Sequence, residues 1–223
     1  MPTIDLQGLA GRYHKVRQSL PGHVTLVAVS KTRSVEEIRA LYDLGHRAFG
    51  ENYPQELREK QAQLPPDIEW HFIGHLQTNK VKHIAPFVHL VHGADRIKLL
   101  DELDLRAAQC GRQQDVLLQV HIAREETKFG FSPTEVGAVM ERIQQWPNLK
   151  VRGLMGMATN TQDKDRIASE FDQLASLYRR IRDGNAPAGF GILSMGMSAD
   201  VELAVQAGST LVRIGTALFG ERV

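Results

Sequence analysis

A lysine at the end of a short apolar run is the first residue whose type and position indicate chemistry. The stretch TLVAVSKT, residues Thr25–Thr32, is rich in β-branched side chains until it reaches Lys31. Such a run is typical of a strand buried on both faces, and lysine is among the residue types least often buried. Either the strand simply ends at solvent, or the amine is partly desolvated, loses its proton and attacks a carbonyl to form a Schiff base.

Two turns rich in small residues follow apolar runs near the end of the sequence. The motif SMGMSAD leads into a predicted helix with Ser198 as its N-cap, and RIGTALFG runs through Gly215 and Thr216 into another. Small residues let the backbone approach a ligand, and helix N-termini present unpaired N–H groups to an anion. Two capped helices without a ligand give the same pattern, so neither turn is specific alone.

The elements that must position these residues alternate between short apolar runs and longer amphipathic ones. The predicted strands are Val24–Ser30, Arg47–Gly50, Glu69–Ile73, Phe87–His92, Val116–Ile122, Val151–Met157, Gly191–Met195 and Leu211–Gly215. Apolar residues at three- and four-residue steps predict helices over Val35–Leu44 and Ile167–Ile181. Capping-box spacings that begin at Ser34 and Ser132 mark two helix starts. An additional helix is expected over Ile4–Leu20.

Eight strands alternating with helices favour an α/β fold of the closed (β/α)₈ TIM-barrel type. The 223 residues fall near the lower end of the range of about 200 to more than 400 residues for this fold. The competing fold is a doubly wound open sheet, which usually carries a G-x-G-x-x-G turn after its first strand, where this chain has Ser30-Lys31-Thr32. No linker-like stretch interrupts the pattern, so residues 1–223 are predicted to form a single domain.

A closed barrel brings the lysine and the small-residue turns together. Its first and eighth strands are neighbours, and phosphate sites in barrels frequently follow strands seven and eight. Lys31 would therefore face an anion site, which favours a phosphorylated aldehyde, and pyridoxal 5′-phosphate is the commonest such cofactor. Arg213 lies two residues before Gly215, so strand alternation directs both toward the interior, within reach of a pyridine ring.

Composition excludes several classes of protein. Twenty-seven basic and 26 acidic residues give a formal net charge of +1, with no sign of a surface for nucleic acid or anionic membrane. The single cysteine, Cys110, excludes an intramolecular disulfide and suits a reducing cytosol. No apolar run approaches the roughly 20 residues that cross a bilayer, and the N-terminus lacks the order of a signal peptide. We expect a cytoplasmic globular protein.

No metal site is predicted. His71 and His75 have the spacing of a helical metal pair, but they flank a run that is predicted to be a strand. His89 and His92 fall on opposite faces of the next predicted strand.

Eight motifs together resemble one known family. They are VAVSKT, FGENY, WHFIGHLQTNK, LVHGAD, TKFGF, GLMGMAT, LSMGMSAD and VRIGTALFG. Their order resembles that in the pyridoxal-phosphate homeostasis proteins, formerly called proline synthase co-transcribed proteins, from about Val24 to Gly220. This family is similar to the barrel domain of alanine racemase and of the fold-type III decarboxylases that use pyridoxal phosphate.

The resemblance implies roles for individual residues. It makes Lys31 the residue that holds pyridoxal phosphate as a Schiff base, and Arg213 the residue that faces the pyridine nitrogen. The implied phosphate-binding residues are Ser198, Gly215 and Thr216, with the backbone of the 196–198 turn. The implied neighbours of the ring are Asn52, His75 and Met157. Arg33 stands where the family often has a lysine, and its guanidinium cannot replace a Schiff-base amine. Lys128, in TKFGF, is a candidate for handling incoming cofactor.

The resemblance leaves the choice between carrier and enzyme. Alanine racemase uses two bases, the cofactor lysine and a tyrosine from a β-rich domain of the neighbouring subunit. This sequence ends at Val223, so we expect no such C-terminal β domain and a monomer. An arginine keeps its proton and leaves the pyridine nitrogen unprotonated, which weakens the ring as an electron sink. Racemases also use this arginine, so the feature alone does not decide between carrier and enzyme.

We therefore expect a protein that stores or delivers pyridoxal phosphate without turnover and has no catalytic residue. Its expected partners are the cofactor and apoenzymes that accept it. Two alternatives stay open, a weak pyridoxal-phosphate-dependent amino-acid racemase and a cofactor-free Schiff-base aldolase of a sugar phosphate.

Overall fold

Eight parallel strands close into a barrel in the computed structural model of the chain, which describes residues 5–125, 129–184 and 186–221. Each strand pairs with the next along the chain, and β1 pairs with β8. The strands are β1 (Thr25–Val29), β2 (Ala48–Glu51), β3 (Glu69–Phe72), β4 (Leu90–Ala94), β5 (Gln114–Val120), β6 (Leu149–Gly156), β7 (Ile192–Ser194) and β8 (Leu211–Ile214). The predicted (β/α)₈ barrel is confirmed.

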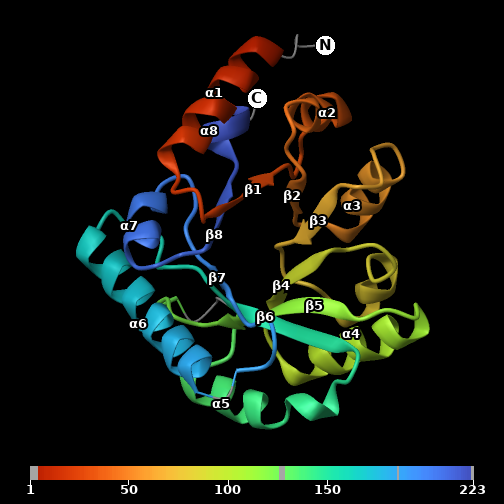
Figure 1. Cartoon of the computed structure of the whole chain (residues 1–223), viewed down its shortest axis with the longest axis vertical. Helices are drawn as coiled ribbons and strands as arrows, with labels where there is room; N and C mark the ends of the chain where they lie inside the picture. Colours follow the sequence, from red (N-terminus) through yellow and green to blue (C-terminus); the bar gives the residue numbers. More distant parts are fainter. Residues whose placement is uncertain (1–4, 126–128, 185, 222–223) are drawn as a thin grey trace.

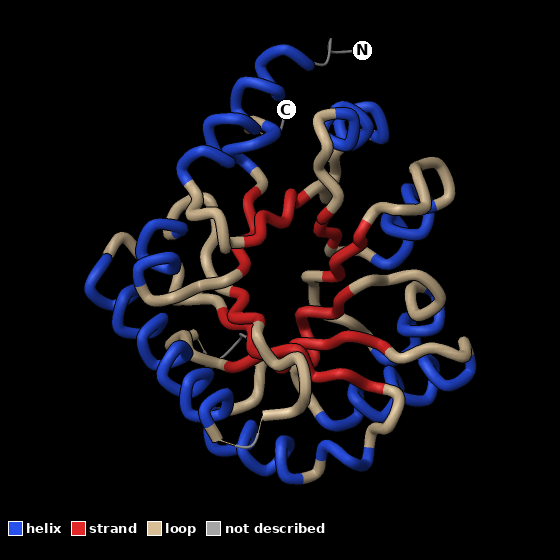
Figure 2. Tube along the Cα trace, in the orientation of Figure 1, coloured by secondary structure: helices blue, strands red, loops and turns tan. Residues whose placement is uncertain are grey.

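Helices surround this ring of strands (Figures 1 and 2). The α-helices of the described residues are α1 (Leu6–Ser19), α2 (Val35–Asp43), α3 (Pro54–Gln61), α4 (Ile97–Gln109), α5 (Pro133–Glu141), α6 (Lys164–Asp183), α7 (Val201–Gln206) and α8 (Thr216–Phe219). Two 3₁₀ helices complete the connections, η1 (Thr78–His83) between β3 and β4, and η2 (Ile143–Gln145) before β6. No helix of the described segments is long and apolar enough to cross a membrane.

Capping residues fix the starts of two helices at the predicted places. The Ser34 hydroxyl accepts a hydrogen bond from the Glu37 amide (3.2 Å), and the Glu37 carboxylate accepts one from the Ser34 amide (2.8 Å). Ser132 and Glu135 form the same reciprocal pair before α5. Each box satisfies two amides that the first turn of a helix leaves unpaired.

Most predicted boundaries differ from those of the structure by one to three residues, and two of the differences have a visible cause. The fourth strand begins at Leu90 rather than Phe87, because the amides of Phe87 and Val88 donate to the carbonyl of Ile84 and form a turn. The helix after β7 begins at Val201, with Asp200 in the N-cap position. The prediction that Ser198 caps this helix is therefore wrong.

Two apolar layers hold the barrel together. The larger lies between the outer faces of the strands and the helices, and includes Phe49, Phe72 and Phe171. A smaller cluster contains Val27, Ala48, Leu90, Leu117, Met155 and Leu211. These residues come from six different strands, and in a barrel of this size side chains fill the interior.

The N-terminal helix packs outside the ring where the chain closes. Helix α1 contacts α8, and the two lie side by side in Figure 1. The Arg12 guanidinium donates a hydrogen bond to the Leu218 carbonyl (2.8 Å). The first and last helices are thereby joined beside β1 and β8.

Candidate functional site

The predicted site residues follow strands that all run in one direction, so they share one rim of the barrel. Lys31 comes two residues after β1, Asn52 one residue after β2, His75 three residues after β3 and Met157 one residue after β6. Ser198 follows β7, while Gly215 and Thr216 directly follow β8. This carboxyl-end rim is where barrel enzymes hold their ligands.

The turn that carries Lys31 lies beside the end of β8. In the β1–β8 pairing Val27 is opposite Arg213, and Ala28 is opposite Ile214. A Cβ atom added to Gly215 would lie 3.3 Å from the Cβ of Val29, a close approach that glycine permits. The half-buried Lys31 therefore follows a strand end that touches the Gly215 turn.

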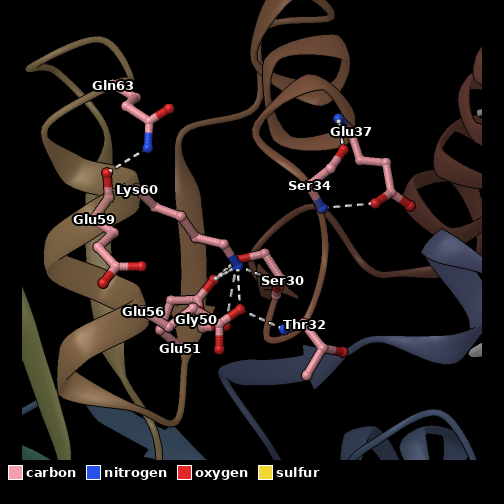
Figure 3. Close-up of polar contacts among 10 residues, drawn as sticks. All are labelled: Ser30, Thr32, Ser34, Glu37, Gly50, Glu51, Glu56, Glu59, Lys60 and Gln63. Atoms are coloured by element: carbon pink, nitrogen blue, oxygen red, sulfur yellow. Dashed lines mark hydrogen bonds and ion pairs between the residues drawn. The ribbon is translucent and has the colours of Figure 1, made fainter. Parts of the chain in front are cut away.

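A buried lysine on α3, Lys60, contacts the backbone of the turn that carries Lys31. The Lys60 ammonium, on α3, donates to the Ser30 carbonyl (2.7 Å), the Glu51 carboxylate (2.8 Å) and the Glu56 carboxylate (2.6 Å). The Ser30 hydroxyl donates to the same Glu51 oxygen (2.6 Å). Figure 3 shows the Lys60 amine at the centre of these groups. We refer to Ser30, Glu51, Glu56 and Lys60 as the Lys60 network.

The Lys60 network also holds the residue after Lys31. Thr32 has a φ of 62°, and among the described residues it alone, apart from glycines, has a positive φ. A non-glycine residue rarely adopts this conformation without support. The Thr32 amide donates to the Glu56 carboxylate (2.5 Å), and the Arg33 amide donates to the Ser30 carbonyl (2.9 Å). The backbone groups of both neighbours of Lys31 are therefore held by hydrogen bonds, that of Ser30 by the Arg33 amide and that of Thr32 by the Glu56 side chain.

Burial opposes the ionised form of Glu51. Its side chain is fully buried, and burial raises its pKa although Lys60 and Ser30 favour the ionised form. One of its oxygens, Oε2, has no hydrogen-bond partner among the described residues. The ion pair with Lys60 is thus formed in a place that disfavours the carboxylate.

The turns after β7 and β8 are joined to each other. The Ala217 amide is 3.4 Å from the Ser198 hydroxyl, which accepts its hydrogen bond. Gly196, with a φ of 97°, lets the chain turn sharply after β7, and an added Cβ there would lie 2.6 Å from the Cβ of Ala204. Met157 and Ser198 line one cavity of about 490 Å³ at this rim. The predicted phosphate residues therefore lie on two linked, closely packed turns.

Asn52 offers a polar atom without a protein partner. Its side-chain oxygen Oδ1 is buried and has no hydrogen-bond partner in the part of the chain that the structure describes. Such atoms are rare in folded proteins and indicate a missing ligand group or water. A Cβ added to Gly74 would lie 2.5 Å from the Asn52 carbonyl oxygen, so β2 and β3 end in close contact. The unpaired acceptor Asn52 Oδ1 at this rim fits a polar ligand that donates a hydrogen bond.

His75 is fixed by a carboxylate and an aromatic ring. Its Nδ1 is 2.9 Å from the Asp95 carboxylate, and its ring stacks on Phe129 with centroids 3.7 Å apart. Arg96 contacts the other Asp95 oxygen and donates to the Leu76 carbonyl (2.9 Å). His75 therefore has a defined orientation at the rim.

Arg213 lies inside the barrel below this rim. Its guanidinium donates to the carbonyl (3.0 Å) and hydroxyl of Ser194 and to the Gly156 carbonyl (3.2 Å). Burial lowers the pKa of Arg213 to about 10, so it stays protonated at neutral pH. The predicted inward orientation of this side chain agrees with its exposure of 4 %.

Two buried histidines extend the contacts of Arg213 through the barrel. His92 Nδ1 is 3.1 Å from the Ser194 hydroxyl, and His92 Nε2 is 2.9 Å from His71 Nδ1. Burial lowers the pKa of His71 to about 3 and that of His92 well below its ordinary value. Both imidazoles are neutral at physiological pH. We refer to His71, His92, Ser194 and Arg213 as the interior chain.

Sequence reasoning missed both buried networks. Glu56 and Lys60 are one helical turn apart, but this spacing is also common on solvated helix faces. His92 and Ser194 are 102 positions apart, and only closure of the barrel joins them. Of the residues predicted from the sequence, Lys128 lies outside the described residues.

Sequence comparison identifies relatives over most of the chain. The family described as the N-terminal domain of alanine racemase matches residues 4–223. A pyridoxal phosphate homeostasis protein of Pseudomonas aeruginosa is 41 % identical over 228 aligned residues, covering 100 % of this chain and 97 % of its own. The protein of that name from Pasteurella multocida is 42 % identical over 204 residues, covering 89 % and 87 %.

Structure comparison gives the same relationship. PipY of Synechococcus elongatus superposes with a TM-score of 0.91 without pyridoxal phosphate and 0.87 with it bound, at 36 % and 35 % identity. Each comparison covers 95 % of this chain and 100 % of PipY. Alanine racemase of Bartonella henselae shares the fold, with a TM-score of 0.75 at 15 % identity, over 98 % of this chain and 60 % of its own. This chain belongs to the family of pyridoxal phosphate homeostasis proteins, a family with the fold of the alanine racemase N-terminal domain.

Proposed function

We propose that this protein binds pyridoxal 5′-phosphate as a Schiff base on Lys31 and stores or delivers it, without turning over a substrate. The main support is that Lys31 lies next to the linked turns of Ser198 and Gly215, where β1 and β8 close the barrel. A phosphorylated aldehyde needs an amine at one end and an anion site at the other. PipY, a relative that was solved with pyridoxal phosphate bound, supports the identity of the ligand.

Each rim residue takes one part of the ligand in this proposal. Lys31 supplies the amine, and Ser198, Gly215 and Thr216 hold the phosphate. Arg213 faces the pyridine nitrogen with those N–H groups that Ser194 and Gly156 do not use. The neighbours of the ring are Asn52, whose Oδ1 is unpaired, His75 and Met157. When bound, pyridoxal phosphate supplies an aldehyde that captures amines and a ring that accepts electrons.

The positions of the tyrosines support a role without turnover. Racemization through this cofactor needs a second base opposite the lysine. Tyr13 packs on His46, Tyr42 donates to Asp67, and Tyr178 stacks on Phe190. Among the four tyrosines, only Tyr53 follows a strand at the rim, and its side chain is exposed.

An absorption experiment tests the cofactor and the lysine. The full chain, loaded with pyridoxal phosphate, should show a visible band that borohydride removes, and mass mapping should locate the reduced adduct on Lys31. Lys31→Ala should lose the band, whereas Lys98→Ala, at an exposed lysine on α4, should keep it. A colourless wild-type protein, or an adduct that maps elsewhere, would overturn the proposal.

A transfer experiment separates the carrier from the racemase. The loaded protein should restore the activity of a pyridoxal-phosphate-free apoenzyme, faster than free cofactor at the same total concentration if it delivers the cofactor directly, and more slowly if it stores it. In heavy water, alanine or serine should not exchange the α-proton. Exchange that Lys31→Ala abolishes would establish the racemase instead.

A further inference from the structure

A second cavity opens at the opposite mouth of the barrel. It has a volume of about 290 Å³ and is lined by residues at the amino ends of the strands. Thr25 begins β1, Glu69 begins β3 and Leu211 begins β8, while His89 directly precedes β4. Since Lys31 follows the carboxyl end of β1, this cavity is separate from the site at the carboxyl-end rim.

Three metal-ligating side chains meet in this cavity. Glu69, His71 and His89 each place one ligand atom within 4.8 Å of the other two. Strand alternation directs Glu69 and His71 to the same side of β3. The His89 amide donates to the Trp70 carbonyl (2.8 Å), which fixes His89 beside them. The rings of His71 and His89 are 5.4 Å apart between centroids.

One atom of this cluster is buried and unpaired. His71 has an exposure of 3 %, and its Nδ1 is used by His92 at 2.9 Å. Its other nitrogen, Nε2, has no hydrogen-bond partner among the described residues. A buried polar atom of this kind requires an explanation. With Nδ1 turned to His92, Nε2 is the atom that His71 offers to Glu69 and His89.

The proton positions of the interior chain leave two arrangements. If His92 donates from Nε2 to His71, the proton of His71 sits on Nε2 as a buried N–H without an acceptor. If His71 donates from Nδ1 to His92, the Nε2 lone pair faces the cavity instead. A metal-bound histidine has this second arrangement, with its other N–H donated to a fixed acceptor. His92 is that acceptor.

We propose that Glu69, His71 and His89 bind one divalent transition-metal ion of the zinc class at the amino-end mouth of the barrel. Two imidazoles and a carboxylate are ligands that zinc accepts, with a fourth position for water. Zinc holds such ligands at about 2.0–2.2 Å, so the ligand atoms must draw together. Glu69 and His89 are exposed, which gives them room to move, while buried His71 is fixed.

Metal titration of the full, tag-free chain tests this proposal. Isothermal titration with zinc chloride should show one equivalent bound per chain. Glu69→Gln and His89→Ala change exposed residues and should each weaken binding by at least the roughly 10- to 100-fold that loss of an outer-shell partner of a metal ligand causes. The control His14→Ala, at an exposed histidine on α1, should bind as the wild type does.

Two further outcomes decide the location of the ion. Pyridoxal phosphate itself chelates metals, so Lys31→Ala, freed of cofactor, should keep the full zinc affinity. Loss of binding in that variant would place the ion at the carboxyl-end rim and overturn the proposal. Absence of stoichiometric binding, or binding that Glu69→Gln and His89→Ala leave unchanged, would also overturn it. The proposed carrier function does not enter this test.

Discussion

The Lys60 network and the interior chain are both buried and polar, but they are built from opposite kinds of groups. The Lys60 network pairs an ammonium with two carboxylates behind the Lys31 turn. The interior chain joins two neutral imidazoles and a hydroxyl to one guanidinium. The first therefore depends on charge pairing and the second on hydrogen bonds between groups that are mostly neutral.

The difference predicts opposite responses to acid. Burial raises the pKa of Glu51, so folding favours its protonated form and its contribution is lost as the pH rises through the folded-state pKa. Burial lowers the pKa values of His71 and His92, so their contribution is present above the unfolded-state pKa and lost as the pH falls. A fall in pH therefore lowers the stability that the interior chain contributes. In the Lys60 network it removes the free-energy cost of burying the Glu51 carboxylate.

The largest expected effect is a loss of stability between pH 7.5 and pH 5. His46, a third buried histidine, has its pKa lowered by burial to about 4. An unfolded histidine with a pKa near 6.5 takes up a proton in this interval, so each buried neutral histidine costs about 2 kcal/mol at pH 5. Urea unfolding at the two pH values, in the presence of a chelator, measures the total. Protonation of Glu51 should reduce this total loss of stability, but a single group should not reverse the effect of three histidines.

Substitution of His46 shows how much of this loss of stability comes from one buried histidine. His46→Gln should remove about 2 kcal/mol of the pH dependence. His14→Gln, at an exposed site, is the matched control. A free energy of unfolding that is equal at both pH values would contradict the account of the interior chain.

Removal of the central cation should have the next largest effect. Lys60→Met leaves Glu51 buried without its partner and the Ser30 carbonyl without a donor, which should cost about 3–5 kcal/mol in the free energy of unfolding. Chemical denaturation at pH 7.5 measures this loss. The double variant Glu51→Gln with Lys60→Met should cost less than the sum of the single changes, because it leaves no unpaired charge at the fully buried position 51.

A surface lysine provides the matched control for this prediction. Lys82→Met, at an exposed position of η1, should change stability by no more than about 0.5 kcal/mol. A similarly small effect of Lys60→Met would show that the Lys60 network does not depend on charge pairing.

The smallest effect should come from Glu56, which is partly exposed. Glu56→Gln keeps the acceptor for the Thr32 amide but removes the charge that pairs with Lys60, at a cost of about 1 kcal/mol. An amide oxygen accepts more weakly than a carboxylate, so the Thr32 turn beside Lys31 should be held less firmly, and the visible band should form more slowly when pyridoxal phosphate is added to the cofactor-free variant. Stopped-flow absorption measures that rate, with Glu59→Gln on the same helix as the control. Equal rates in both variants would show that the Lys60 network does not influence how Lys31 reacts with the cofactor.

Local patterns predicted the elements well and the polar interior poorly. The serine–glutamate spacings at Ser34 and Ser132 predicted helix starts that the capping hydrogen bonds confirm. Ser198 followed the same type of reasoning, but its hydroxyl accepts from Ala217 of another turn. A cap prediction fails where a side chain finds a partner distant in the chain.

The sequence by itself determined the order of strands and helices, the barrel and the position of Lys31 at a strand end. These features follow from apolar periodicity and capping, which act over a few residues. Only the tertiary structure decided that Lys60 supports the Lys31 turn, and that His71 reaches Arg213 through His92 and Ser194. These contacts depend on barrel closure, which brings residues from different strands within hydrogen-bonding distance and removes them from water.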